Sequence, residues 1–263
     1  MNYDEIISKL KTEKSEIIIP SAEATSKILD KLRTNDEDEK TMLEKLANED
    51  YEKKKIKPVP DPEKQRLDII MAFDTTGSMS AYIKEVRENI GFVSQALFDT
   101  IKMRIALVGI GDHCDGDKMM QIRDYTTNIT TLKQNIESIA NTGGGDAPEA
   151  YECLFKELNR WEYPNPTAMV MIIDSYPHGM STKSPDNGCP FKVDYKKELT
   201  ELKTHLKNLY IVSCGNRRYQ EQFVDEEKCI IDLKDIKKLP HLIVGMCMSE
   251  VGRLGYFMRR LEE

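Results

Sequence analysis

The sequence lacks the features of membrane-spanning, nucleic-acid-binding and disulfide-rich proteins. Its longest apolar windows, such as Leu242 to Met248, are far shorter than the roughly 20 residues that span a bilayer, and no apolar secretory segment is recognised near Met1. Acidic residues outnumber basic ones, 45 to 38, which argues against a nucleic-acid partner. The six cysteines form no C-x-x-C pair, so we expect reduced, mostly buried thiols. These absences predict a cytoplasmic protein without nucleic-acid or membrane partners.

The chain has two compositional zones. Residues 1–66 are rich in Lys, Glu and Asp, and their apolar residues form only thin stripes on short helical segments. A proline-rich stretch at 58–62 predicts a stiff, extended linker before a domain that spans 67–263. We interpret the first zone as a charged helical arm, which either packs weakly on the domain or serves docking or oligomerisation.

Three oxygen-bearing side chains follow the first strand of this domain. The apolar run Leu67–Phe73 predicts a strand buried on both faces, and a helical pattern begins at Ala81. Asp74, Thr76 and Ser78 lie on the turn between them, which is where open α/β sheets bind ligands. Because Mg²⁺ prefers oxygen ligands, this turn is a candidate metal site, although the same residues would also suit a helix cap.

The rest of the domain alternates between strands and helices. Further strands are expected at 103–110, 121–125, 168–173, 209–213 and 229–233. Helices are expected at 81–101, 130–140, 147–161, 195–206, 217–224 and 242–261. This alternation predicts an α/β fold with a doubly wound, mostly parallel sheet flanked by helices.

Three ordered motifs lie at the turns between the predicted elements. They are Asp-Thr-Thr-Gly-Ser-Met at 74–79, Asn-Thr-Gly-Gly-Gly-Asp-Ala-Pro-Glu at 141–149 and Ile-Ile-Asp-Ser-Tyr-Pro-His-Gly at 172–179. In this order they resemble the three motifs of von Willebrand factor A (vWA) domains. With the Asp-His-Cys-Asp tetrad at 112–115, the sequence looks most similar to vWA domains attached to alpha-type protein kinases. The resemblance covers residues 67 to about 260 and implies a Rossmann-like sheet of six strands with the first strand in its centre.

The resemblance also implies a metal-ion-dependent adhesion site (MIDAS) where the three motifs meet. Thr76 and Ser78 would bind the ion directly, and Asp74 and Asp174 would hold it directly or through water. Asp146 would be the fifth residue of the site. The expected ion is Mg²⁺, with Mn²⁺ or Ca²⁺ as alternatives, because hard cations take oxygen ligands.

Asp146 departs from the integrin-like branch of the family, which carries a threonine there. A third acid neutralises more of the ion's charge, which weakens capture of a partner's carboxylate. Thr142 is an alternative hydroxyl ligand, and Asp146 would also suit an N-cap for a helix starting at Ala147.

A second cluster is expected beside the metal site, formed by His113, Cys114, Asp115 and His178. These side chains are plausible Zn²⁺ ligands, with Cys189 as a candidate fourth, but the sequence lacks the paired spacing of structural zinc sites. We favour the simpler interpretation, in which they form hydrogen bonds that orient the carboxylates of the metal site.

The sequence indicates a binding module rather than an enzyme, since no nucleophile-and-histidine pattern of a known hydrolase is visible. We expect a metal-dependent protein-interaction module, an adaptor or regulatory subunit, that engages an Asp or Glu side chain of a partner protein. The alternatives are a metal-assisted hydrolase, with His113 or His178 as base, and an accessory subunit of a kinase system. The resemblance further implies that the final helix, expected at 242–261, shifts along the sheet when a ligand binds.

Overall fold

The computed structural model describes residues 67–98, 103–180, 188–226 and 229–252. The predicted N-terminal arm and linker at 1–66 lie outside these residues, as does the end of the last predicted helix. Within the described part of the chain, no helix is both long enough and apolar enough to cross a bilayer.

The domain is built on a six-stranded sheet with the order β3-β2-β1-β5-β7-β8. All neighbouring pairs are parallel except β2 and β3, so the prediction of a mostly parallel sheet with a central first strand is confirmed. The strands are β1 (Leu67–Asp74), β2 (Met103–Ile110), β3 (Met120–Thr126), β5 (Thr167–Ile173), β7 (Asn208–Ser213) and β8 (Ile230–Asp232).

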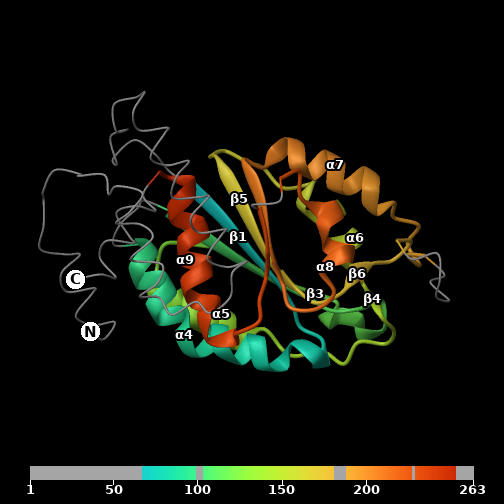
Figure 1. Ribbon diagram of the computed structural model, residues 1–263, viewed down its shortest axis with the longest axis horizontal. Coiled ribbons are helices and arrows are strands. Elements are labelled where there is room, and N and C mark those ends of the chain that lie inside the picture. The colour runs from blue at the N-terminus through green and yellow to red at the C-terminus, as the bar shows by residue number, and fades with distance from the viewer. Residues whose placement is uncertain (1–66, 99–102, 181–187, 227–228, 253–263) are drawn as a thin grey trace, which may run out of the picture.

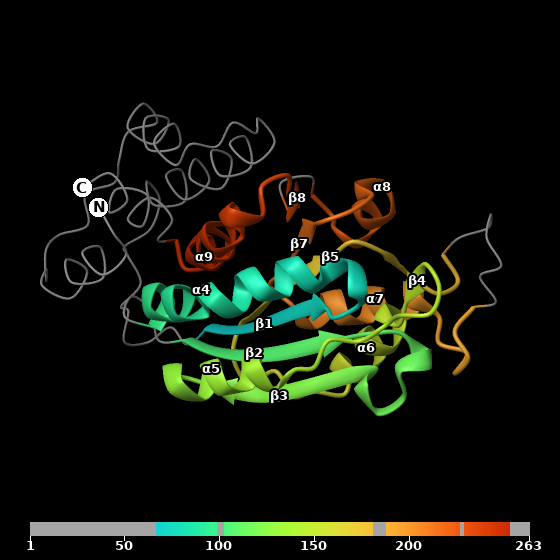
Figure 2. The ribbon, with the colours of Figure 1, turned by 90° about the horizontal axis from the view of Figure 1, so that it is seen from below.

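Helices cover both faces of the sheet (Figure 1; Figure 2). One layer contains α4 (Ser80–Phe98), α5 (Ile129–Ser138) and α9 (Leu239–Glu250). The other contains α6 (Tyr151–Leu158) and α7 (Tyr195–His205), with the short α8 (Arg217–Gln220) beside them. Side chains of β1 alternate between the two cores, with Met71 and Phe73 in the first and Ile70 and Ala72 in the second. Every residue of β1 is buried, as its apolar run predicts.

The second motif does not enter a helix where the sequence predicts one. Pro148–Glu149 forms a short strand, β4, which pairs in parallel with β6 (Tyr176–Pro177), and α6 begins only at Tyr151. The expected helix from Ala147, with Asp146 as its N-cap, is therefore wrong. The proline has no N–H to donate, and pairing across the rim holds its segment in an extended conformation.

The last helix is also placed differently from its prediction. It begins at Leu239, with Pro240 in its first turn, and ends at Glu250. Gly252 follows with a φ of 63°, and its N–H donates to the Ser249 carbonyl at 3.0 Å. A left-handed glycine just past the last turn is a common helix C-terminus, so Gly252 ends this helix and is not part of it.

A buried carboxylate anchors the end of α9 to the start of β7. Glu250 accepts hydrogen bonds from Asn208 Nδ2 at 2.6 Å and from the Tyr210 hydroxyl, and Lys207 Nζ lies 3.1 Å from its other oxygen. Glu250 is 7% exposed, and the three partners compensate the burial of its charge.

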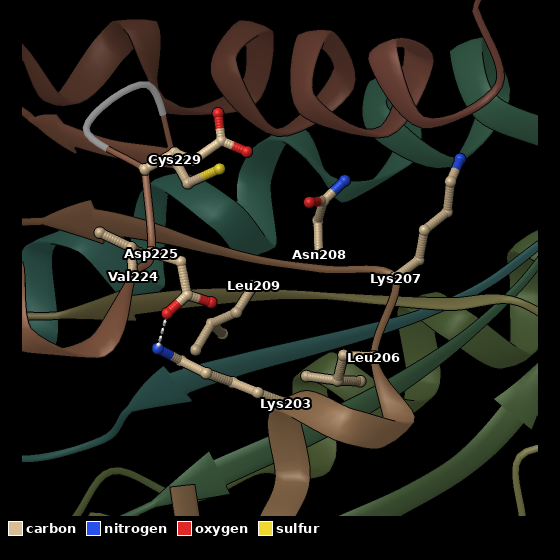
Figure 3. A pocket seen from close by; sticks show the side chains of 9 residues that line it. Lys203, Leu206, Lys207, Asn208, Leu209, Val224, Asp225 and Cys229 are labelled. Atoms are coloured by element: carbon tan, nitrogen blue, oxygen red, sulfur yellow. Dashed lines mark hydrogen bonds and ion pairs between the residues drawn. The ribbon is translucent and has the colours of Figure 1, made fainter. Parts of the chain in front are cut away.

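A small hollow lies at the amino ends of β7 and β8, whereas the motifs lie at the carboxyl ends of the strands. Figure 3 shows the side chains that line it. Lys203 and Asp225 face each other across it, with Nζ 2.7 Å from the carboxylate. The charges of this pair are therefore balanced within the protein.

Candidate metal centre

The carboxyl ends of the central strands are held together as one rim. Asp74, the last residue of β1, is paired with Ile110 of β2. The Thr75 N–H and hydroxyl both donate to the Ile110 carbonyl, at 2.7 and 3.0 Å. Thr142 N–H donates to the Thr75 carbonyl at 2.8 Å, and the two threonine hydroxyls lie 3.0 Å apart. The ends of β1 and β2 and the start of the second motif are thus joined at the rim.

Asp74 is fully buried, and protein groups engage both of its oxygens. Oδ1 accepts from the Thr76 N–H at 2.7 Å and from the Thr76 hydroxyl at 2.6 Å, and Oδ2 accepts from the Tyr151 hydroxyl. Burial, opposed by these hydrogen bonds and assisted by the charge of Asp174, raises the pKa of Asp74 to about 6. Ser78, the other predicted hydroxyl ligand, is exposed on the same turn.

Glu149 is a site residue that the sequence analysis missed. It is 5% exposed, and its Oε2 has no hydrogen-bond partner among the described residues. Burial and the nearby charges of Asp74, Asp112 and Asp174 raise the pKa of the Glu149 carboxyl to about 10. The pairing of Pro148–Glu149 with Tyr176–Pro177, a segment distant in the sequence, holds this residue at the rim.

A glycine lets Glu149 and the first turn approach each other. Gly144 has a φ of 69°, and a Cβ at that position would lie 3.3 Å from Thr76 Cγ2 and 3.4 Å from Glu149 Oε1. The close approach brings the Glu149 carboxylate beside the Asp-x-Thr-Gly-Ser turn. A glycine is needed here both for the backbone angle and for the space.

Asp74 and Glu149 form no ion pair among the described residues. The ion pairs of lysines and arginines there are formed with other carboxylates, as between Lys203 and Asp225 at the opposite end of the strands. Buried carboxylates of this kind are stabilised by protonation or by a cation. The donor set of carboxylates and hydroxyls, with the unpaired Glu149 oxygen, therefore fits a hard divalent cation.

The other predicted residues of the second motif have different surroundings. Asp146 has a side chain that is 56% exposed, and its Oδ1 lies 3.7 Å from His178 Nε2. Thr142 is engaged with Thr75, as described above. Asp115 accepts from the Asp112 N–H at 2.8 Å and from the Gly143 N–H at 3.1 Å, so it fixes the loops that carry these groups.

Two of the four residues of the predicted second cluster, His113 and His178, lie together beside a carboxylate that the sequence analysis did not include. The rings of His113 and His178 lie 4.6 Å apart, and His113 Nε2 is 2.7 Å from Oε1 of the buried Glu152. His178 Nε2 lies 3.5 Å from Asp112 Oδ1. Burial lowers the pKa of His178, but Glu152 and the neighbouring aspartates outweigh it and raise the pKa above its usual value.

Cys114 is exposed beside this cluster. Partial loss of solvent around the thiol and a hydrogen bond with Asp112 raise the pKa of Cys114 to about 11. The cluster borders a shallow hollow lined by Asp112, Cys114, Asp146 and His178. Histidine and carboxylate groups are therefore available next to the candidate metal centre.

The metal-free protein should lose stability as pH rises, because the folded pKa values of Asp74 and Glu149 lie above their unfolded values of 3.8 and 4.5. The folded state then binds more protons than the unfolded state between about pH 4 and about pH 10, so ionisation opposes folding. We expect a fall of at least about 1.4 kcal/mol in the free energy of unfolding, equivalent to one pKa unit. Urea denaturation of the metal-free protein between about pH 4 and about pH 8 measures it.

Glu149→Gln is the matched variant for this pH dependence, since it removes the larger shift and keeps the shape of the side chain. Its unfolding free energy should change less with pH than that of the unmodified chain. Equal pH profiles for the two proteins would contradict the assignment of Glu149.

Comparison with known proteins relates the fold, but not the function, to characterised domains. No family model matches the sequence, and no curated protein matches it. The pilus adhesin SpaC from Lactobacillus rhamnosus GG matches with a TM-score of 0.54 and 10% identity, over 71% of this chain and 30% of its own. The vWF domain of the pilus tip protein Mfa5 from Porphyromonas gingivalis matches with a TM-score of 0.54 and 10% identity, over 71% and 95%. Proximal thread matrix protein 1 from the mussel byssus matches with a TM-score of 0.52 and 11% identity, over 71% and 48%.

These similarities show a vWA-type, Rossmann-like fold. The chain spans less than a third of the adhesin and about half of the byssus protein. At this level of identity the similarity concerns the architecture, and a function for the chain must come from its own residues.

Proposed function

We propose that the chain is a metal-dependent protein-interaction module, an adaptor or regulatory subunit in the cytoplasm. Its rim would bind Mg²⁺, or Mn²⁺ or Ca²⁺, and through the ion an Asp or Glu side chain of a partner protein. The observation that carries this proposal is the convergence of buried Asp74 and Glu149 without a cationic partner among the described residues.

The proposed ligands combine the predicted residues with Glu149. The hydroxyls of Thr76 and Ser78 and the carboxylates of Asp74 and Asp174 would hold the ion, directly or through water. Glu149 and the more exposed Asp146 add negative charge nearby. When bound, the ion supplies a positive centre that attracts an outside carboxylate.

Electrostatics make the proposed interaction dependent on the ion. Without a cation, the carboxylates at the rim repel an acidic side chain, and the net charge of -7 adds to this repulsion. Two of the similar structures, a pilus adhesin and a pilus tip protein, are consistent with a binding role for this architecture. The link to kinase systems rests on the sequence motifs and stays a prediction.

A calorimetric titration of the full chain with Mg²⁺ and with Mn²⁺ tests the proposed site. We expect a single saturable site, and capture of a partner protein that is lost on chelation and restored by Mg²⁺. Heats no larger than dilution for both ions would contradict the proposal. A Ser78→Ala variant is the companion, since it removes one proposed ligand from an exposed position.

The second candidate, a metal-assisted hydrolase, is favoured by one observation. His178 lies beside Asp112 and Asp146 at the edge of the hollow next to the rim, where it could act as a base. Mn²⁺-dependent turnover of a generic phosphate ester that is lost in His178→Asn would favour this function over the binding module.

A further inference from the structure

A second group of potential metal ligands lies below the rim and has a different chemical character. One ring nitrogen of His113, one carboxylate oxygen of Glu152 and the sulfurs of Cys153 and Cys189 all lie within 4.8 Å of one another. Glu152, Cys153 and Cys189 are buried, and the His113 side chain is only 9% exposed. The set differs from the sequence prediction, because Glu152 and Cys153 take the places expected for Cys114 and Asp115.

Three separate segments supply these side chains. His113 begins the 3₁₀ segment His113–Lys118, which follows β2. Glu152 and Cys153 stand in the first turn of α6, and Cys189 precedes α7. A metal ion bound by all four would link these segments as a covalent cross-link would.

The distances suit tetrahedral zinc. With Zn–S near 2.3 Å and Zn–N or Zn–O near 2.0–2.2 Å, neighbouring ligand atoms stand about 3.3–3.8 Å apart. The two sulfurs are 3.6 Å apart, and Cys153 Sγ is 3.9 Å from Glu152 Oε1. The 2.7 Å between His113 Nε2 and Glu152 Oε1 is a hydrogen bond, which a zinc ion would replace by moving the two groups apart by less than about 1 Å.

Neighbouring groups already orient the histidine and the glutamate. His113 Nδ1 lies 3.2 Å from Met119 Sδ, a weak acceptor for an Nδ1–H, which directs Nε2 toward the cluster. Glu152 Oε2 accepts from the backbone N–H of His178 at 3.1 Å, and Oε1 faces His113, Cys153 and, at 3.5 Å, Nδ1 of His178. Such contacts around a metal ligand fix its tautomer and direction.

We propose that His113, Glu152, Cys153 and Cys189 bind a structural zinc ion, separate from the cation of the rim. Thiolate and imidazole ligands select zinc, whereas the oxygen ligands of the rim select hard cations. Four protein ligands leave no open position on a tetrahedral ion, which indicates a structural role. Binding releases the two thiol protons to solvent, and the carboxylate and two thiolates balance the charge of the ion to within one unit.

The expected effect of the zinc ion is to fix the segment before α7 against the start of α6. The backbone N–H of His178 contacts the Glu152 carboxylate, so the ion also steadies the third motif beside the rim. The proposal does not depend on metal binding at the rim, because the two sites share no ligand.

Metal analysis of the full chain, purified under reducing conditions, tests the proposal. We expect a stoichiometric amount of zinc, which falls at least about tenfold in Cys153→Ser and in Cys189→Ser. Cys114→Ser is the matched control, because its thiol is exposed and outside the ligand set. It should keep the zinc, and so should Asp74→Asn at the rim.

Cobalt substitution provides a readout that does not require the variants to fold. The unmodified chain loaded with Co²⁺ should show the visible absorption of tetrahedral cobalt with a near-ultraviolet sulfur-to-cobalt band. A cobalt spectrum without the sulfur band, or a zinc content equal in Cys189→Ser and the unmodified chain, would overturn the proposal. A disulfide between Cys153 and Cys189 would also overturn it. Mass spectrometry of the alkylated, unreduced chain from freshly lysed cells would detect this bond as the loss of two thiol hydrogens.

Discussion

Replacing Asp74 with asparagine should abolish cation binding at the rim and leave the fold intact. The amide oxygen can still accept from the Thr76 N–H and hydroxyl, and the amide nitrogen can donate to the Tyr151 hydroxyl, so the hydrogen bonds survive. Only the negative charge is lost. We expect Mg²⁺ affinity to fall by at least about 100-fold, or about 2.7 kcal/mol, in a calorimetric titration.

The matched control is Asp117→Asn, which removes an exposed carboxylate from the neighbouring loop. Its Mg²⁺ affinity should equal that of the unmodified chain. If both variants bind Mg²⁺ as tightly as the unmodified chain, Asp74 is not a ligand and the rim is not the cation site.

Asparagine is a better test than alanine at this position. From the sequence alone, Asp74→Ala is expected to be harmless to folding, since it removes a carboxylate from an acidic cluster. The structure shows that it would also leave three donors on Thr76 and Tyr151 without their acceptor. At about 1–3 kcal/mol for each unsatisfied buried group, the alanine variant should be destabilised by several kcal/mol.

Gly215→Ala should damage both the fold and the rim without touching a proposed ligand side chain. A Cβ at position 215 would lie 2.2 Å from the carbonyl oxygen of Asp174 and 3.0 Å from its Cα. These are backbone atoms, so the strand end must move to relieve the clash. We expect a loss of about 3 kcal/mol in the free energy of unfolding. Displacement of Asp174 should also weaken Mg²⁺ binding by on the order of tenfold.

Gly91→Ala separates this effect from a general effect of replacing glycine. A Cβ at position 91, inside α4, would meet only the far end of the Lys133 side chain, at 2.9 Å from Cε. This flexible chain can move, and alanine is the better helix former, so we expect a gain of up to about 1 kcal/mol. A Gly215→Ala protein with unchanged thermal stability and unchanged Mg²⁺ affinity would contradict the packing argument.

The central strand and the turn after it could be predicted from the sequence because their signals are local. A mostly apolar run at Leu67–Phe73 must be covered on both faces, and the switch to Asp74, Thr76 and Ser78 marks the end of the strand. The elements that follow in the chain are likewise specified by short-range patterns, and most of their bounds lie within a few residues of their predicted positions.

Glu149 and Glu152 could not be predicted as site residues because their environment is set by distant segments. Glu149 is held by the pairing of Pro148–Glu149 with Tyr176–Pro177, which no local pattern reveals. Glu152 lies in the first turn of an amphipathic helix, where an acid is ordinary, and only the approach of His113 and Cys189 gives it a chemical role. Side-chain clusters built from several loops are visible only in three dimensions.

The anchoring of Glu250 to the start of β7 sets a threshold for any movement of α9 along the sheet. A shift of one helical turn, about 5.4 Å, would separate Glu250 from Asn208, Tyr210 and Lys207. Two hydrogen bonds and one ion pair to this buried carboxylate are together worth on the order of 5 kcal/mol. A free energy of about 5 kcal/mol corresponds to a factor of several thousand in affinity. A partner would therefore have to bind the shifted form that much more tightly than the present form to populate both equally. A partner that binds weakly at the rim would leave α9 in its present position, and only a tightly binding partner could shift it.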